Sequence, residues 1–458
     1  MTRLFGIETE YGLLQPGGTP RSQVEDSRRL VAGCDEPHAV GWDYSFESPR
    51  NDLRGFRAAS LQHDPVDAVF DQGRSAAPIE DERSDRILIN GARFYNDHGH
   101  PEYATPECSR LLDLVAHDRA GERIAFAAAK KVGATLYKNN SDYSGASYGT
   151  HENYLVPRQI GFDALASGLL PLLVCRQIFT GAGKVGSEAG RDVDFQLSQR
   201  ADFLNEVASV DTLYRRPIFN TRDEPHADAA QWTRFHVICG DANRSEWATA
   251  MKVGMVRIAL ELIALGEAPT WRLADPVRAF SDISKDAARV WKIDLDHGSW
   301  TTAPDVLETY LAAAAIHLAG IDAETDWILA EWNTGLTDIR TDPLALADRV
   351  DWVAKLNLLR AYANDVGKWE IDALRSVEME YHDIDPETSL FDLLLGMGSM
   401  LRLVPEVRIE DSMTCAPTTR AAHRSKVVAE HADRVEAIGW RRAVVAGKVI
   451  EFEIEGTP

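Results

Sequence analysis

The stretch Phe5-Gly6-Ile7-Glu8-Thr9-Glu10-Tyr11 alternates apolar and acidic side chains. In a β-strand, successive side chains point to opposite faces, and residues two apart lie about 6.6 Å from each other on one face. Phe5, Ile7 and Tyr11 therefore point one way, and Glu8 and Glu10 point the other. The stretch predicts a strand with an apolar face and a carboxylate face. Paired carboxylates on strands are commonly exposed, so a solvated outer face is the alternative to a functional site.

The same two-residue spacing gathers polar side chains on three later strand-like segments. They are Arg93, Tyr95 and Asp97, then His151 and Asn153, then Arg234 and His236. Glu102 and Glu107 closely follow the first segment. Such groups on one side of a sheet must be neutralised, because an unpaired buried charge costs several kcal/mol. A divalent metal with a bound phosphate does this, and carboxylates mixed with few imidazoles favour Mg²⁺ or Mn²⁺ over zinc. We expect a sheet that cradles metal and ATP, with a buried structural role as the alternative for any single histidine.

Apolar periodicity divides the rest of the chain into strand-like and helical segments. Strands are predicted at Leu4–Leu13, Ile87–Tyr95, Ala134–Lys138, His151–Pro157, Arg216–Asn220 and Arg234–Gly240. Helices are predicted at Cys108–Val132, Phe162–Phe179 and Ser245–Leu265, and the Ala/Leu/Trp-rich stretch Leu273–Leu374 is also predicted to be helical. Strict alternation of strand and helix is missing. This favours an α+β fold, with an antiparallel or mixed sheet flanked by helices, over a Rossmann or barrel fold.

Two regions stand apart from this pattern. Residues Gln15–Asp85 are rich in Pro, Gly, Ser, Asp and Arg, and they predict a long loop. The turn-rich stretch Tyr381–Glu387 leads into a last section, whose predicted elements are helices near Leu390–Leu401 and Ala421–Ala437 and a hairpin through Trp440 and Phe452. We expect a catalytic domain over residues 1–378 and a small C-terminal domain over residues 379–458.

The composition excludes several classes of protein. The 458 residues include 49 Lys and Arg against 71 Asp and Glu, a formal net charge of −22, so the diffuse basic field of nucleic-acid binding proteins is absent. No stretch of the ~18 residues that a membrane helix needs is uncharged, and Glu8 and Glu10 interrupt any apolar run of a signal peptide. We expect a cytoplasmic protein without nucleic-acid or membrane partners. Its five cysteines form no C-x-x-C pair, which argues against a disulfide framework or structural zinc.

Two glycine-rich motifs suggest other chemistry. Gly145–Gly149 fits the G-x-S-x-G of serine hydrolases, but a nucleophile elbow leads into a helix, whereas the residues that follow alternate like a strand. Gly181–Gly186 fits G-x-G-x-x-G, but it follows a predicted helix and has Val185 where a Walker loop has Ser or Thr. A flexible connection is therefore favoured there.

A zinc hydrolase site is a further alternative. His98 and His100 have the H-x-H spacing that opens such a site, and its other ligands would be His151, His226 and His236. The repeat of the barrel that carries this kind of site is not visible in the sequence.

Longer motifs follow one another in a fixed order along the chain. They are Gly6-Ile7-Glu8-Thr9-Glu10-Tyr11-Gly12, Asn90-Gly91-Ala92-Arg93-Phe94-Tyr95, His100-Pro101-Glu102-Tyr103, Lys138-Asn139-Asn140, Gly149-Thr150-His151-Glu152-Asn153-Tyr154, Gln196–Arg200, Asn220–Asp228, Gly240–Asn243, Tyr381-His382-Asp383 and Thr418-Thr419-Arg420. Together they resemble the Pup ligase and depupylase (Dop) family. The resemblance covers essentially the whole chain, and so many motifs in one order are far more specific than any single pattern.

This resemblance implies a glutamine-synthetase-like fold, related to carboxylate-amine ligases, and a set of site residues. Asp97 would be the catalytic carboxylate, and Arg222 would lie beside the substrate carboxyl group. Mg²⁺, or Mn²⁺ as the alternative, would be held by Glu8, Tyr95, Glu102, His151 and His236. ATP would contact Glu10, Arg93, Thr105, Asn153, Ile238 and Trp440.

The family contains two opposite activities. The ligase joins the C-terminal glutamate side chain of Pup to a target lysine, and the depupylase cleaves that bond or deamidates a C-terminal glutamine. The loop at about 36–85, with Trp42-Asp43-Tyr44 and Arg54-Gly55-Phe56, and the compact spacing of Asp97–Pro101 are similar to Dop, whereas the opening Gly6–Glu10 is closer to the ligase.

The resemblance therefore implies an ATP- and Mg²⁺-dependent depupylase or deamidase that acts on Pup or a related ubiquitin-like modifier. A Pup–protein ligase that works through a glutamyl phosphate is the alternative. A zinc amidohydrolase and an inactive binding scaffold are the minor alternatives.

Overall fold

A nine-stranded mixed sheet forms the centre of the computed structural model, which describes residues 4–19, 22–61, 84–212 and 216–453. The strand order is β11-β12-β13-β8-β1-β6-β5-β4-β3, with β11 and β12 parallel and the other pairs antiparallel. The strands are β1 Phe5–Glu10, β3 His38–Ala39, β4 Arg86–Leu88, β5 Arg93–Asp97, β6 His100–Ala104, β8 Thr150–Pro157, β11 Glu206–Ser209, β12 Pro217–Asn220 and β13 Trp232–Val237. The predicted α+β class is confirmed.

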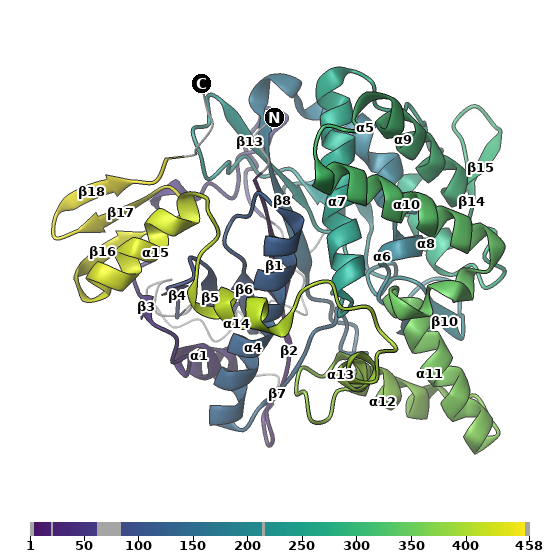
Figure 1. Ribbon diagram of the computed structural model, residues 1–458, viewed down its shortest axis with the longest axis horizontal. Helices are drawn as coiled ribbons and strands as arrows, with labels where there is room; N and C mark the ends of the chain where they lie inside the picture. Colours follow the sequence, from purple (N-terminus) through teal and green to yellow (C-terminus); the bar gives the residue numbers. More distant parts are fainter. Residues whose placement is uncertain (1–3, 20–21, 62–83, 213–215, 454–458) are drawn as a thin grey trace.

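One face of this sheet is apolar and carries helices. Phe5, Ile7 and Phe235 belong to the main core, which they share with α5 and α7, and Phe94 and Tyr103 pack with α1 and α4 in a second core. Figure 1 shows α4 and α7 passing in front of the central strands. The bounds of these helices are α1 Gln23–Ala32, α4 Leu111–Val132, α5 Phe162–Cys175 and α7 Glu246–Leu265. Because strand side chains alternate, Glu8 and the other predicted site residues of the strands lie on the opposite face.

The predicted long loop contains a helix, so that prediction is wrong in part. Helix α1 lies within Gln15–Asp85 and buries Ser27, Leu30 and Val31. The pattern was hidden because a ten-residue helix with one short apolar stripe looks like a polar loop. Residues 33–61 and 84–85 are otherwise mainly irregular, apart from β3 and the 3₁₀ helix Tyr44–Phe46, and residues 62–83 lie outside the described part of the chain.

The predicted strand Ile87–Tyr95 is a hairpin of β4 and β5. Its turn contains Gly91, whose φ of 82° is in the left-handed region, and Asn90, whose side chain accepts a hydrogen bond from the Ala92 amide at 3.0 Å. Asn-Gly is a strong turn signal that the apolar periodicity concealed. Similarly, the predicted strand Leu4–Leu13 is divided into β1 and β2.

The remaining elements lie around this core. The helices are α6 Gln177–Thr180, α8 Pro276–Ser284, α9 Ala303–His317, α10 Ala323–Thr341, α11 Asp351–Val366, α12 Ile371–His382, α13 Leu390–Gly396, α14 Glu406–Thr414 and α15 Arg420–His431. The short strands are β2 Gly12–Leu14, β7 Thr135–Tyr137, β9 Lys184–Val185, β10 Phe195–Gln196, β14 Lys292–Asp294, β15 Trp300–Thr302, β16 Val435–Ile438, β17 Arg442–Val445 and β18 Lys448–Glu451. Across the described residues, the helices fall short of the combined length and hydrophobicity of a bilayer span.

The C-terminal section packs on several parts of the molecule. Helix α13 packs on α11 and α12 through Phe391, and α14 packs on α4 through Ile409. The three-stranded sheet β16-β17-β18 and α15 share a small core with Ala39 and Ile87 at the β3–β4 end of the main sheet. Figure 1 shows this unit in yellow beside β3 and β4. The helix predicted to reach Ala437 ends at His431, and a separate domain starting at residue 379 stays a prediction.

Candidate active site

Strand register brings the polar faces of five neighbouring strands together. On β1, Glu10 lies opposite Glu102 of β6, which in turn lies opposite Tyr95 of β5. Glu8 lies opposite His151 of β8. Asn153 of β8 lies opposite His236 of β13. The predicted metal ligands are therefore brought to one region of the sheet.

Glu8, His151 and His236 form the first cluster, with one ligand atom from each within 4.8 Å of the others. Glu8 Oε2 lies 3.5 Å from His151 Nδ1 and 3.6 Å from His236 Nε2. Although burial opposes ionisation, contacts with His151 and His236 lower the pKa of Glu8 well below its usual range. Burial, reinforced by Arg234, lowers the pKa of His236 to about 3, so its imidazole is neutral. A carboxylate beside two imidazoles is a suitable donor set for a divalent metal.

Glu10, Asp97 and Glu102 form a second cluster, in which three carboxylate oxygens lie within 4.8 Å of one another. Burial, followed by the charges of Asp97, Glu8 and Glu10, raises the pKa of Glu102 well above its usual range. Tyr95 Oη donates to Glu102 Oε1 at 2.5 Å. Three carboxylates this close repel one another, and a hard divalent cation relieves that repulsion. The residues of both clusters thus fit the predicted Mg²⁺ or Mn²⁺.

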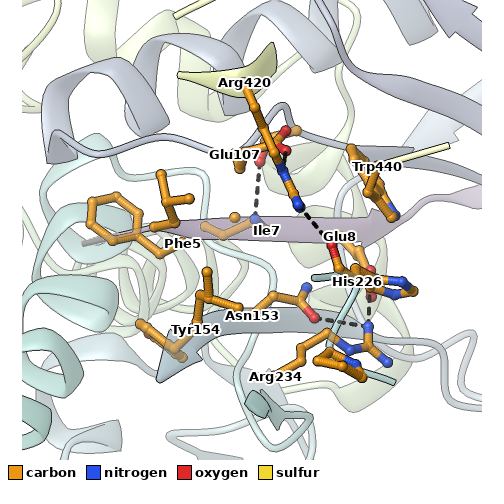
Figure 2. A pocket seen from close by; sticks show the side chains of 16 residues that line it. Phe5, Ile7, Glu8, Glu107, Asn153, Tyr154, His226, Arg234, Arg420 and Trp440 are labelled. Carbon is orange, nitrogen blue, oxygen red and sulfur yellow. Dashed lines mark hydrogen bonds and ion pairs between the residues drawn. The ribbon is translucent and has the colours of Figure 1, made fainter. Parts of the chain in front are cut away.

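A pocket lies next to the first cluster, on the β1, β6 and β8 part of the sheet (Figure 2). Its empty volume is about 540 Å³, part of which is open solvent. Gly6 and Thr105 both line the pocket, and a Cβ atom at Gly6 would lie 3.2 Å from Thr105 Oγ1. Glycine therefore allows β1 to lie close to Thr105. Asn153 Oδ1 accepts a hydrogen bond of 3.0 Å from Arg234 Nη1 at the edge of the pocket. Leu4, Leu155 and Trp440 provide apolar side chains in its lining.

The predicted ATP contacts occupy different places. Thr105, Asn153 and Trp440 line the pocket, and Glu10 lies in the second cluster. The Arg93 guanidinium lies 4.0 Å from the ring of Trp42 and 3.8 Å from that of Tyr95, and it pairs with Asp85 at 2.7 Å. Ile238 is buried, and its carbonyl accepts a hydrogen bond of 3.3 Å from Arg200. The nucleotide roles of these residues stay predictions.

Arg222 follows β12, at the side of the site nearest β13. Its Nε donates to the Val210 carbonyl at 3.2 Å, and its Nη2 lies 3.3 Å from Thr212 Oγ1. The segment that contains it continues to Pro225 and His226, which line the pocket. Its predicted place beside a substrate carboxyl group stays a prediction.

The structure separates the histidines of the zinc alternative. His100 stacks on Tyr148 with ring centroids 4.5 Å apart, and its Nδ1 faces the Tyr11 carbonyl at 3.2 Å. His98 Nε2 lies 4.0 Å from Asp97. Among the described residues, the His151–His236 cluster is completed by Glu8 and includes neither His98 nor His100.

The two glycine-rich motifs are structural. Gly145–Gly149 leads into strand β8, as its sequence predicts, so there is no nucleophile elbow at this point of the described chain. Gly181–Gly186 follows α6 and includes β9. Lys184 within it is buried and pairs with Glu188 and Asp202. These ion pairs hold the connection in the interior of the protein.

Sequence reasoning missed three residues that line the pocket. His226 was considered only as a zinc ligand, and Glu107 and Arg420 had no role. Arg420 pairs with Glu107 across 313 positions of sequence, so no local pattern indicates the contact. The only signal was that Arg420 ends the Thr418-Thr419-Arg420 motif.

Comparison with known proteins now identifies the family. A family model described as Pup-ligase protein matches residues 3–444. The chain belongs to this family. It is 38% identical to the Pup deamidase/depupylase of Mycolicibacterium smegmatis, over 96% of this chain and 91% of the relative. It is also 38% identical to the Pup–protein ligase of Micrococcus luteus, over 94% of this chain and 89% of the relative.

Solved structures of this family have the same fold. The complex between the prokaryotic ubiquitin-like protein Pup and its ligase PafA superposes with a TM-score of 0.80 at 29% identity, covering 99% of this chain and 89% of that one. The Pup ligase PafA in complex with ADP gives a TM-score of 0.74 at 30% identity, covering 87% of this chain and 93% of that one. The predicted membership of the Pup ligase and depupylase family is confirmed.

Proposed function

We propose that this protein is an ATP- and Mg²⁺-dependent depupylase of the cytoplasm. It cleaves the isopeptide bond between the C-terminal glutamate side chain of Pup, or of a related modifier, and a substrate lysine, and it deamidates a C-terminal glutamine. Relatives of equal identity carry both the depupylase and the ligase names, so identity alone does not favour either. The observation that carries the proposal is the loop between β3 and β4.

This loop crosses to the segment that follows β12 and is bonded to it. The Ser48 amide donates to Glu224 at 2.7 Å, and the Leu53 amide donates to the Thr221 carbonyl at 2.8 Å. Asp52 is buried and accepts hydrogen bonds from Arg54 and Thr221. The described part of this loop, up to residue 61, thus lies beside Arg222, with Asp52 as its bridge partner. Since the loop resembles the Dop insertion, this position supports a hydrolytic activity.

The geometry supports a carboxylate-driven reaction. Asp97 ends β5 and faces the other acids of the second cluster, and as the catalytic carboxylate it attacks the amide carbonyl or orients a phosphate or water that does so. Arg222 stabilises the negative charge that develops on the carbonyl oxygen. Mg²⁺, which Glu8, Tyr95, Glu102, His151 and His236 would hold, would supply electrostatic stabilisation of negative charge in the site. ATP binds beside Thr105, Asn153 and Trp440 and acts as a cofactor that is not consumed.

The ligase remains the second candidate, because both solved relatives described above are ligases and the opening Gly6–Glu10 is closer to the ligase motif. In that reaction the γ-phosphoryl group goes to the Pup glutamate, and Asp97 accepts the proton of the incoming lysine amine. The same residues would serve both reactions, one that forms the isopeptide bond at the expense of ATP and one that hydrolyses it.

One assay separates the two activities. Purified protein is incubated with Mg²⁺ and ATP, once with a Pup conjugate and once with free Glu-ended Pup and a lysine-containing target. We expect the conjugate to give free Pup and unmodified target. In a parallel incubation with Gln-ended Pup, we expect release of ammonia. An intact conjugate together with ligation of free Pup would overturn the depupylase assignment. Cleavage that needs no nucleotide, is lost with EDTA and is restored by Zn²⁺ but not by Mg²⁺ would instead favour the zinc alternative.

A further inference from the structure

Arg420 connects the nucleotide pocket to the segment that carries Arg222. It is the first residue of α15 and only 6% exposed, and it lines the pocket together with Trp440 and His226. Its Nε donates to Glu107, and its Nη1 donates to the His226 carbonyl at 2.7 Å. Figure 2 shows Arg420 reaching from the C-terminal side over the pocket toward His226. One side chain therefore bonds two segments that are far apart in the sequence.

Glu107 fixes the start of α15 in this position. Its carboxylate accepts hydrogen bonds from both Arg420 and Arg424, and its backbone carbonyl accepts one of 2.7 Å from Thr419. Although burial opposes ionisation, the charges of Arg424 and Arg420 lower the pKa of Glu107 to about 2. The guanidinium of Arg420 is thus held in one orientation by a permanently charged partner.

The third guanidinium nitrogen is available to a ligand. Within the described residues, Arg420 Nη2 has no hydrogen-bond partner, while Nε and Nη1 are both engaged. Because two other bonds already fix the guanidinium, little freedom is lost when Nη2 donates a charge-assisted hydrogen bond to a ligand. The surrounding pocket combines apolar walls with the indole of Trp440, which suits the base and ribose of a nucleotide.

The His226 carbonyl links this site to the next segment. His226 has a φ of 50°, a left-handed conformation that a non-glycine residue adopts only when its surroundings enforce it. Its ring lies 6.4 Å from that of Trp440, and Arg420 holds its carbonyl. Four residues earlier stands Arg222, the predicted neighbour of the substrate carboxyl group.

We propose that Arg420 is a positioning residue that binds the nucleoside part of ATP through Nη2 and, through the His226 carbonyl, orders the segment of Arg222 when the nucleotide is bound. This inference rests on the proposed ATP-dependent function and adds to it a physical link between the bound nucleotide and the modifier. Nucleotide binding then orders the segment of Arg222, which lies on the side of the site that receives the modifier.

The test compares Arg420→Lys with Arg424→Lys. Both changes weaken the pairing with Glu107 on the same helix, but Arg424 does not line the pocket. It otherwise bonds the Gly91 carbonyl and lies 4.6 Å from the ring of Trp440, beside which a lysine keeps a positive charge. Binding of a non-hydrolysable ATP analogue with Mg²⁺ is measured by calorimetry, and amide hydrogen exchange of residues 221–227 is measured with and without the analogue. We expect Arg420→Lys to weaken binding about tenfold and to abolish the protection of residues 221–227. Arg424→Lys should keep the affinity within twofold and keep that protection.

The results distinguish this inference from the proposed function. If the unmodified protein binds no nucleotide, the proposed function fails, and the inference fails with it. If the unmodified protein binds the analogue without protecting residues 221–227, the link alone is refuted, and this needs no variant. Equal affinity and protection in Arg420→Lys and the unmodified protein would also refute it.

Discussion

Glu10 and Glu102 face each other directly across the antiparallel strands β1 and β6. Like charges in opposite positions of a sheet destabilise it, and here Asp97 adds a third carboxylate within 4.8 Å. The fold therefore contains a local repulsion among these carboxylates, which a bound cation would relieve. This is a relationship expected of a binding site and not of a structural acid pair.

Glu102→Gln should uncouple stability from divalent cations. Removing one of three crowded acids raises the metal-free stability by about 1 kcal/mol, or roughly 1 to 2 °C in a chain of this size. The same change removes a ligand, so the melting shift produced by Mg²⁺ with nucleotide should be lost. Differential scanning fluorimetry with and without the cation measures both effects. The exposed Glu25→Gln serves as the control, and a full cation response in Glu102→Gln would contradict the site.

Asp97→Asn should separate binding from turnover. The amide keeps the shape of the side chain but loses its charge, so the nucleotide affinity should stay within about threefold, while cleavage falls by about three orders of magnitude. Calorimetry with the ATP analogue and gel analysis of a Pup conjugate give the two numbers. Asp372→Asn, at a side chain that is 90% exposed, is the matched control. Undiminished cleavage would remove Asp97 from its proposed role.

Gly149→Ala should damage the first cluster through shape alone. A Cβ atom at position 149 would lie 2.0 Å from His151 Nε2, so the imidazole has to leave its present position, in which its Nδ1 lies 3.5 Å from Glu8. We expect the affinity for Mn²⁺ to fall at least tenfold, measured by calorimetry, with the helical content unchanged. Gly396→Ala adds a methyl group where no atom lies within 4 Å and should leave the affinity unaltered. Normal Mn²⁺ binding in Gly149→Ala would argue against His151 as a ligand.

The sequence predicts the composition of the site better than its arrangement. Alternation alone indicates that Glu8 and Glu10 share one face of a strand, because the two-residue period is a local property. That β1 lies between β6 and β8 is a tertiary fact, so the pairing of Glu8 with His151 and of Glu10 with Glu102 could not be derived from any segment. Family resemblance supplied what periodicity could not.

The errors have the same origin. The β4–β5 hairpin was missed although Asn90-Gly91 marks its turn, because continuous apolar residues on both sides outweighed a two-residue signal. Arg420 was missed as a pocket residue because its contacts with Glu107 and His226 connect positions that are far apart in the chain. Long-range ion pairs have no local sequence signature.

His117 should make the stability depend on pH. It is buried in α4, and burial lowers its pKa to about 4 from the ordinary value of 6.5. Between these values the unfolded chain binds a proton that the folded protein does not, so the contribution of His117 to stability is complete above pH 6.5 and is lost as the pH falls to 4. The loss is about 3 kcal/mol at most. In His117→Gln, urea midpoints should therefore fall less steeply between pH 6.5 and 4 than in the unmodified protein. The exposed His423→Gln should reproduce the unmodified slope, and parallel slopes for His117→Gln and the unmodified protein would show that His117 does not titrate in this range.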